Sequence, residues 1–194
     1  MKQLFSAFTV AILTIAGSAQ AETSIDWSGA YAGVSLARSA GEHHYSYSYY
    51  NGSDGDYELN KATDLGLHVG YRLDQGNYVL GAELAYTKLG TAEAGWPDYH
   101  YDKLLDLKLS AGYKIGSALT YLTVGASAAK FDSDGPKDTV KGGLVGLGIA
   151  YALTDKFTIG GEFNVRELTG DEIDEYKDFK AHVKTFELRA SYNF

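Results

Sequence analysis

The chain has 194 residues, of which 45% are apolar, 22% are charged and 13% are aromatic, enough for one folded domain. Lys and Arg number 17 against 25 Asp and Glu, and this net charge of −8 disfavours nucleic acid as a partner, because phosphate binding needs a positive field. The absence of cysteine excludes disulfides, thiolate metal sites and cysteine nucleophiles.

Residues 1–21 have the features of a secretory signal peptide. Lys2 supplies a positive start, an apolar run follows from residue 4 to residue 16, and Ser18 to Ala21 offers small residues at an Ala-x-Ala cleavage site. The run is too short to span a bilayer as a helix, which needs about 20 residues. A buried core helix is the alternative. We expect an exported protein whose barrel domain comprises residues 22–194.

The rest of the chain alternates with period two, which is typical of strands that have two different faces. In the clearest case Leu65, Leu67 and Val69 alternate with Gly66 and His68. The mean hydropathy of −0.21 argues against a bundle of transmembrane helices but not against a membrane barrel. The predicted strands comprise about residues 27–38, 64–73, 80–87, 105–115, 118–131, 145–151, 157–166 and 186–194.

The connections between these strands alternate in length. Short turns are predicted at 74–77, 116–117 and 154–156, and long loops at 39–60, 90–100, 132–140 and 169–180. This alternation is typical of an up-and-down barrel with short turns on one side of a membrane and long loops on the other. The strand lengths also suit a tilted crossing, which needs roughly 9 to 11 residues.

Periodicity alone does not decide which face is outside, and a soluble lipocalin-like barrel would place its apolar face inside. Two features of the second face favour a membrane barrel: it is rich in glycine, and it carries charges of both signs. Aromatic residues beside the short turns suit a bilayer interface; they are Tyr71, Tyr78, Tyr113, Tyr151, Phe157, Tyr192 and Phe194. We therefore predict an all-β fold, an eight-stranded antiparallel up-and-down transmembrane β-barrel.

Charged residues of the second face are predicted to form an ion-pair network inside the barrel. Eight strands enclose an interior just wide enough for side chains to fill it. The alternative is that the glycines leave a narrow watery path, gated by these charges. The predicted network comprises Asp64, Arg72, Glu83, Asp106, Lys108, Lys114, Glu162, Arg166, Glu187 and Arg189.

The two ends of the domain resemble a known family. Residues 25–33 resemble the first strand of the small OmpA-like and opacity-type porin-like barrels of the Gram-negative outer membrane. The resemblance covers residues 27–194 and implies a location in the cell outer membrane, with outer-membrane lipid and lipopolysaccharide as partners. The peptidoglycan-binding domain of OmpA itself is not expected here. A pattern that resembles the C-terminal signal for the outer-membrane assembly machinery is formed by Phe186, Leu188, Ala190, Tyr192 and Phe194.

We expect a structural or porin-like envelope protein without catalysis, cofactor or metal. The segment His44–Tyr45–Ser46 has the His-x-Ser spacing of outer-membrane deacylases, but it lies in a predicted loop without an orienting carboxylate. The stretch 54–58 lacks the length and register of a calcium loop. An acidic, solvated loop is expected around residues 171–175, where Asp171, Glu172, Asp174 and Glu175 are found.

The alternative function is adhesion or another surface interaction through the extracellular loops, whose ligand the sequence does not identify. The first loop combines Tyr45, Tyr47, Tyr49, Tyr50 and Tyr57 with Ser and Gly, a composition that binding surfaces use. The simpler interpretation is that these tyrosines prolong a hairpin above the membrane. The four long loops carry more net negative charge than the whole chain, so a pore at this face would prefer cations.

Overall fold

The computed structural model describes residues 25–45, 55–58, 62–88, 100–132, 138–170 and 179–194. The predicted signal peptide and its cleavage site lie outside the described residues. Within those residues there is no helix long and apolar enough to cross a membrane. The strands are β1 Gly29–Tyr45, β2 Gly55–Glu58, β3 Ala62–Gln75, β4 Tyr78–Lys88, β5 His100–Ile115, β6 Ala118–Asp132, β7 Asp138–Ala152, β8 Phe157–Gly170 and β9 Phe179–Asn193.

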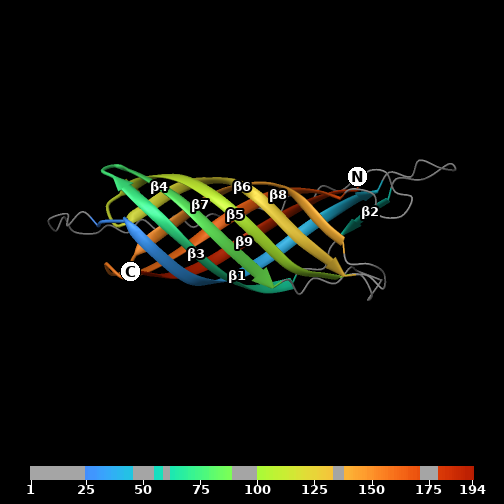
Figure 1. Ribbon diagram of the computed structural model, residues 1–194, viewed down its shortest axis with the longest axis horizontal. Coiled ribbons are helices and arrows are strands. Elements are labelled where there is room, and N and C mark those ends of the chain that lie inside the picture. The colour runs from blue at the N-terminus through green and yellow to red at the C-terminus, as the bar shows by residue number, and fades with distance from the viewer. Residues whose placement is uncertain (1–24, 46–54, 59–61, 89–99, 133–137, 171–178) are drawn as a thin grey trace, which may run out of the picture.

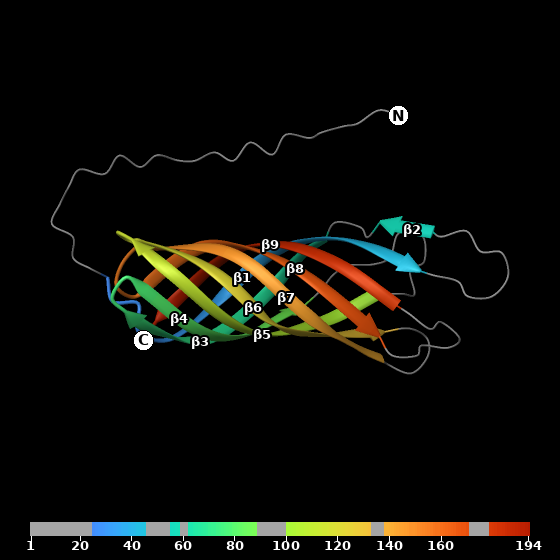
Figure 2. The ribbon, with the colours of Figure 1, turned by 90° about the horizontal axis from the view of Figure 1, so that it is seen from above.

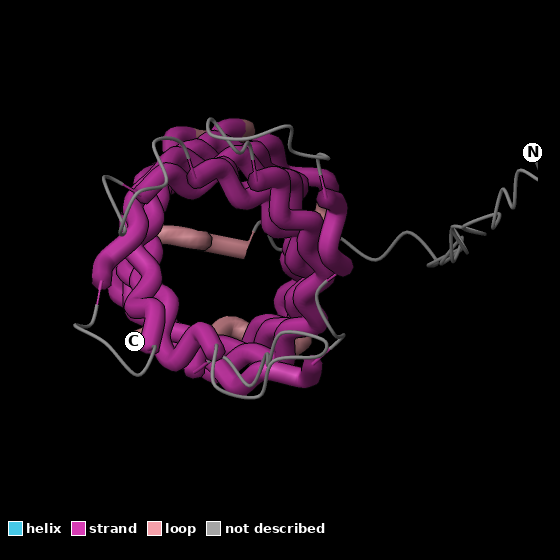
Figure 3. The backbone as a smooth tube through the Cα atoms, turned by 90° about the vertical axis from the view of Figure 1, so that its right-hand side faces the viewer, coloured by secondary structure: helices cyan, strands magenta, loops and turns pink. Residues whose placement is uncertain are grey.

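Eight of these strands close into an antiparallel barrel, which confirms the predicted fold. Each long strand pairs with the next along the chain, and β9 pairs with β1 to close the ring (Figure 3). The short strand β2 pairs only with the far end of β1 and lies at one end of the barrel (Figure 2). The tight turns also follow the prediction, with two residues between β3 and β4 and two between β5 and β6.

The strands are strongly tilted against the barrel axis (Figure 1). A path of directly paired residues that leaves β3 at Gln75 runs once around the barrel and returns to β3 at Leu65, ten residues away. With eight strands, this stagger corresponds to a tilt of about 40°. Directly paired residues on successive strands therefore lie progressively farther from the short turns.

Strands extend beyond their predicted ends at the loop side of the barrel. The predicted loop 39–60 is shorter in the structure, because β1 continues to Tyr45 and β2 pairs with it in the register Tyr45↔Gly55. Strands β5, β7, β8 and β9 also reach into the other predicted loops. The alternation of apolar and polar residues ends where contact with lipid would end, but backbone pairing between the strands continues. The sequence pattern therefore marks only the part of each strand on the turn side.

The large apolar side chains point outward, which rules out the lipocalin-like alternative. Leu65 on β3 is 66% exposed and Leu122 on β6 is also 66% exposed, while polar side chains such as Arg166 are fully buried inside. A soluble barrel with this surface would expose a continuous apolar wall to water. Near the turns, the rings of Tyr78 and Tyr113 pack edge-on with centroids 5.4 Å apart.

Apolar side chains also occupy both ends of the interior. At the turn end, Trp27 packs with Val79 and Leu119, and its backbone N–H donates to Asp74. At the loop end, Leu104, Ala129, Val140 and Leu168 form a second buried cluster. The central polar interior therefore lies between two apolar clusters.

Interior glycines make room for large side chains from other strands. A Cβ built on Gly148 of β7 would lie 2.2 Å from the ring of Tyr121, and one on Gly70 of β3 would lie 2.5 Å from the ring of Tyr31. The phenol group of Tyr121 donates a hydrogen bond of 2.8 Å to Glu162 across the interior. Aromatic rings fill the space that the missing side chains leave.

Replacement of Gly148 by Ala should therefore displace the Tyr121 ring and destabilise the barrel by about 1–3 kcal/mol, the usual effect of overpacking. Gly143→Ala is the matched control: on the same strand, an added Cβ would have its nearest neighbour at 3.9 Å. We expect the control to shift stability by less than about 1 kcal/mol. Urea unfolding of the refolded protein, followed by the mobility of unboiled gel samples, measures both. Equal losses in the two variants would contradict this packing argument.

Candidate functional site: the charged interior

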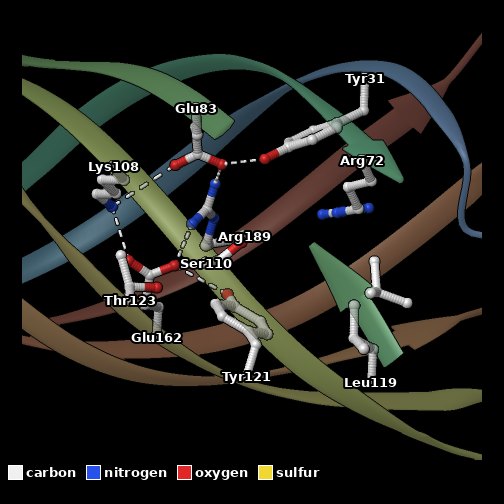
Figure 4. A pocket seen from close by; sticks show the side chains of 11 residues that line it. Tyr31, Arg72, Glu83, Lys108, Ser110, Leu119, Tyr121, Thr123, Glu162 and Arg189 are labelled. Atoms are coloured by element: carbon white, nitrogen blue, oxygen red, sulfur yellow. Dashed lines mark hydrogen bonds and ion pairs between the residues drawn. The ribbon is translucent and has the colours of Figure 1, made fainter. Parts of the chain in front are cut away.

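The centre of the barrel holds a four-membered ion cluster drawn from four strands (Figure 4). The Arg189 guanidinium on β9 donates to both Glu83 on β4 and Glu162 on β8. Lys108 on β5 lies 2.7 Å from Glu162 and 3.6 Å from Glu83. Two cations thus alternate with two carboxylates, and every member of the cluster is largely buried.

Two tyrosines complete this central cluster from the turn side. Tyr31 on β1 donates to Glu83 and Tyr121 on β6 donates to Glu162, each over 2.8 Å. Charge-assisted bonds of this kind are about twice as strong as neutral ones. The two carboxylates therefore accept bonds from four other strands, which cross-link the barrel through its interior.

A second cluster lies toward the loop end. Arg166 on β8 donates to both carboxylate oxygens of Asp106 on β5, over 2.6 and 3.3 Å, and lies 3.5 Å from Glu187 on β9. Its remaining nitrogen donates to Thr185 over 3.0 Å, and Ser127 donates to Asp106 over 2.6 Å. The fully buried guanidinium thus has an acceptor for each of its three nitrogens.

Asn164 joins the two clusters. Its Nδ2 donates to Glu162 over 2.9 Å and to Glu187 over 3.2 Å, and the side chain is fully buried. A single hydrogen-bonded network therefore runs through the middle of the interior. Such a network rigidifies a fold when its members are satisfied, and it is costly when one is removed.

Three of the predicted network residues have other contacts. Arg72 lies over the Tyr31 ring, 3.8 Å from its centroid, where it makes a cation–π contact. Lys114 pairs at 2.7 Å with Asp74, at the edge of a turn. Asp64, near the loop end, accepts a bond of 3.0 Å from Ser39. The structure thus places all ten predicted residues inside the barrel or at its turn edge, but groups them in several layers.

The predicted charge network does not include its neutral partners, chiefly Tyr31, Tyr121 and Asn164. Each shares the inward parity of its strand, so parity alone could have assigned them to the interior. His68 on the inward face of β3 is also paired, since its Nε2 lies 2.8 Å from the hydroxyl of Ser191. The sequence carries no signal that identifies Ser191 as its partner.

Little open space remains beside the central cluster. A cavity of about 20 Å³ lies beside the central cluster, lined among others by Glu83, Ser110 and Thr123 (Figure 4). One water molecule needs about 10–15 Å³ of such space. A single water there would serve the Thr123 hydroxyl and Glu83 Oε1, which make no hydrogen bond to the described residues.

The other candidate sites of the sequence are outside or at the edge of the described chain. Ser46 of the His-x-Ser segment and the acidic stretch 171–175 are not described, and Asp54 also lies outside, while 55–58 forms β2. The described residues contain no group of three or more metal-ligating side chains. The outward face of β9 carries the terminal pattern of Phe186, Leu188, Ala190 and Tyr192, which ends at the exposed Phe194.

Comparisons with known proteins agree with this architecture. Neisserial surface protein A is 18% identical and superposes with a TM-score of 0.52, covering 86% of this chain and 98% of its own. That likeness shows the fold alone.

Two further structures have lower TM-scores, from which we draw no argument. Ail of Yersinia pestis is 19% identical at a TM-score of 0.46, covering 86% of this chain and 99% of its own. The N-terminal β-barrel domain of Pseudomonas aeruginosa OprF is 13% identical at 0.48, with coverages of 84% and 97%. No curated protein matches the chain. The model of the outer membrane protein beta-barrel domain matches residues 9–194, so the chain belongs to this family and is an outer-membrane protein.

Proposed function

We propose that this protein is a structural barrel with a closed lumen, which stiffens the outer membrane locally and holds its long loops at the cell surface. One observation carries the proposal: the buried ion network lies between two apolar clusters, one at each end of the interior. No catalysis is part of the proposal.

The interior supports this role better than a conducting one. A permeant ion needs water or polar ligands along its whole path. Here the open space beside the network is about 20 Å³, and an apolar cluster lies toward each end of the interior. Passage would require the displacement of Arg189 or Lys108 from their carboxylates, which leaves buried charges without partners. The rings of Tyr31 and Tyr121 lie in the space beside Gly70 and Gly148, which favours a closed lumen over a narrow watery path left by the glycines.

A second candidate function is surface interaction through the first loop. Tyr45 at the end of β1 pairs with Gly55 of β2 on one side and with Phe179 of β9 on the other. At this level β1 lies between β2 and β9 in a three-stranded sheet, from whose strands β1 and β2 residues 46–54 connect in the sequence. If these residues bind a ligand, their replacement by a short Gly-Ser turn should abolish attachment of cells that display the protein, while gel mobility stays unchanged.

The closed lumen is tested by single-channel recording of the refolded protein in a planar bilayer. We expect a silent bilayer, because the ion network fills the middle of the interior and apolar clusters lie toward both of its ends. The double variant Glu162→Ala/Arg189→Ala, which removes the central cross-link, should show brief openings. Discrete, long-lived openings of the native protein, with a preference for cations, would instead make it a narrow pore and overturn the proposal.

The bracing role of the network is tested by comparing two arginines. Arg166→Met should cost about 3–5 kcal/mol, because it leaves the buried carboxylates of Asp106 and Glu187 without their cation. Arg72→Met should cost only about 0.5–2 kcal/mol, since it removes mainly a cation–π contact. Urea unfolding of the refolded variants measures both losses.

The triple variant Arg166→Met/Asp106→Asn/Glu187→Gln is the control. It removes the charges together with their partner and should recover part of the loss. Equal losses for the two single arginine variants, with no recovery in the triple variant, would contradict the bracing role.

A further inference from the structure

Arg72 on β3 is a charged interior residue whose contacts with the described part of the chain are aromatic. Its Cζ lies 3.8 Å from the centroid of the Tyr31 ring and 5.5 Å from that of the Trp27 ring. Within the described residues, the guanidinium makes neither a hydrogen bond nor an ion pair. A cation–π contact uses the positive charge but gives the N–H groups no acceptor. The donors of Arg72 are therefore available to a ligand.

Gly81 on β4 leaves a space beside this arginine. It pairs with Arg72 on one side and with Ser110 of β5 on the other, and Ser110 pairs with Thr123 of β6. A Cβ built on Gly81 would lie 2.6 Å from the Ser110 hydroxyl and 3.7 Å from Cγ of Arg72. The Cα atoms of Arg72 and Ser110 are two strand spacings apart, about 10 Å. No side chain stands between them at this register.

Two hydroxyl groups line the same space. Ser110, Thr123 and Arg72 all border the cavity of about 20 Å³, and Figure 4 shows the guanidinium pointing into it beside the Tyr31 ring. Thr123 is 2% exposed, and its hydroxyl has no hydrogen-bond partner among the described residues. The Ser110 hydroxyl has none there either. Since buried donors normally meet an acceptor, the row lacks one.

The charges around this cavity leave one cation in excess. Two carboxylates and three cations line it: Glu83, Glu162, Arg72, Lys108 and Arg189. Four of them neutralise one another in the central cluster, so the excess belongs to Arg72. The opposite excess lies in the second cluster, where Asp106 and Glu187 share Arg166. The central cluster separates the two, and an uncompensated charge in a narrow interior is costly.

We propose that Arg72 and Ser110 bind one small monovalent anion of halide size, such as chloride, on the turn side of the interior. The guanidinium supplies the positive charge and N–H donors, and the Ser110 hydroxyl donates from across the space that Gly81 leaves. A water bound to Thr123 and Glu83 has a second hydrogen for the same anion. The cavity suits an ion little larger than water, and sulfate or phosphate is too large for it. The site needs no path through the barrel and is independent of whether the lumen conducts.

Crystals of the refolded protein grown with sodium bromide test the site directly, because bromide scatters anomalously. We expect an anomalous peak between the Arg72 guanidinium and the Ser110 hydroxyl in the native protein, and none there in Arg72→Gln. A native map without a peak at this position would overturn the proposal, as would a peak that persists in Arg72→Gln.

Urea unfolding tests binding in solution. Chloride replaces gluconate, which is too large for the cavity, at constant ionic strength. Because an anion that binds only the folded state stabilises it by mass action, the native midpoint should rise with chloride. Arg72→Gln should abolish this rise, and Ser110→Ala should weaken the affinity for chloride by about tenfold. Lys156→Gln is the matched control: it removes one positive charge from a turn and should keep the native response.

The serine variant keeps the test decisive if Arg72→Gln does not refold, because it removes a single hydroxyl. Equal midpoints of the native protein in chloride and gluconate would show that no halide binds. An unchanged chloride affinity in Ser110→Ala, or a loss of the response in Lys156→Gln equal to that in Arg72→Gln, would contradict the assigned site.

Discussion

The structure depends first on the hydrogen-bonding needs of the backbone in lipid. In the bilayer core no water is available for free N–H and C=O groups, so a sheet can cross only if it has no open edge. Here β9 pairs with β1 over fifteen positions, from Tyr31↔Asn193 to Tyr45↔Phe179. Closure with eight strands and a stagger of ten residues makes the interior narrow, so that side chains can fill it.

A narrow interior must be filled, and this chain fills it in layers. Apolar side chains occupy the two ends, and an ion network occupies the middle. Gly70 leaves space for the ring of Tyr31, and Gly148 leaves space for the ring of Tyr121. The hydroxyl groups of both tyrosines donate to buried carboxylates. The buried charges are tolerable because nearly all of them meet an opposite charge or a hydrogen-bond donor. The contacts of these charges cross-link the strands through the interior.

The outer surface differs between the two ends of the barrel. Aromatic rings such as Tyr78 and Tyr113 mark the turn side, whereas exposed cations such as Lys88 and Lys130 lie on the loop side.

The sequence by itself determined the strand count, the short turns and the face that each residue presents, because alternation with period two and turn residues are local properties. The sequence underestimated the length of the strands on the loop side, where β1 continues to Tyr45 without apolar alternation. Only the tertiary structure decided which charges meet. Arg166 finds Asp106 sixty residues away, Lys108 lies between Glu83 and Glu162, and Lys88, Lys103 and Lys130 align in one row. These contacts depend on strand register and barrel stagger. A shift of two residues along a strand would change the partner of every residue, although each side chain would keep its inward or outward face.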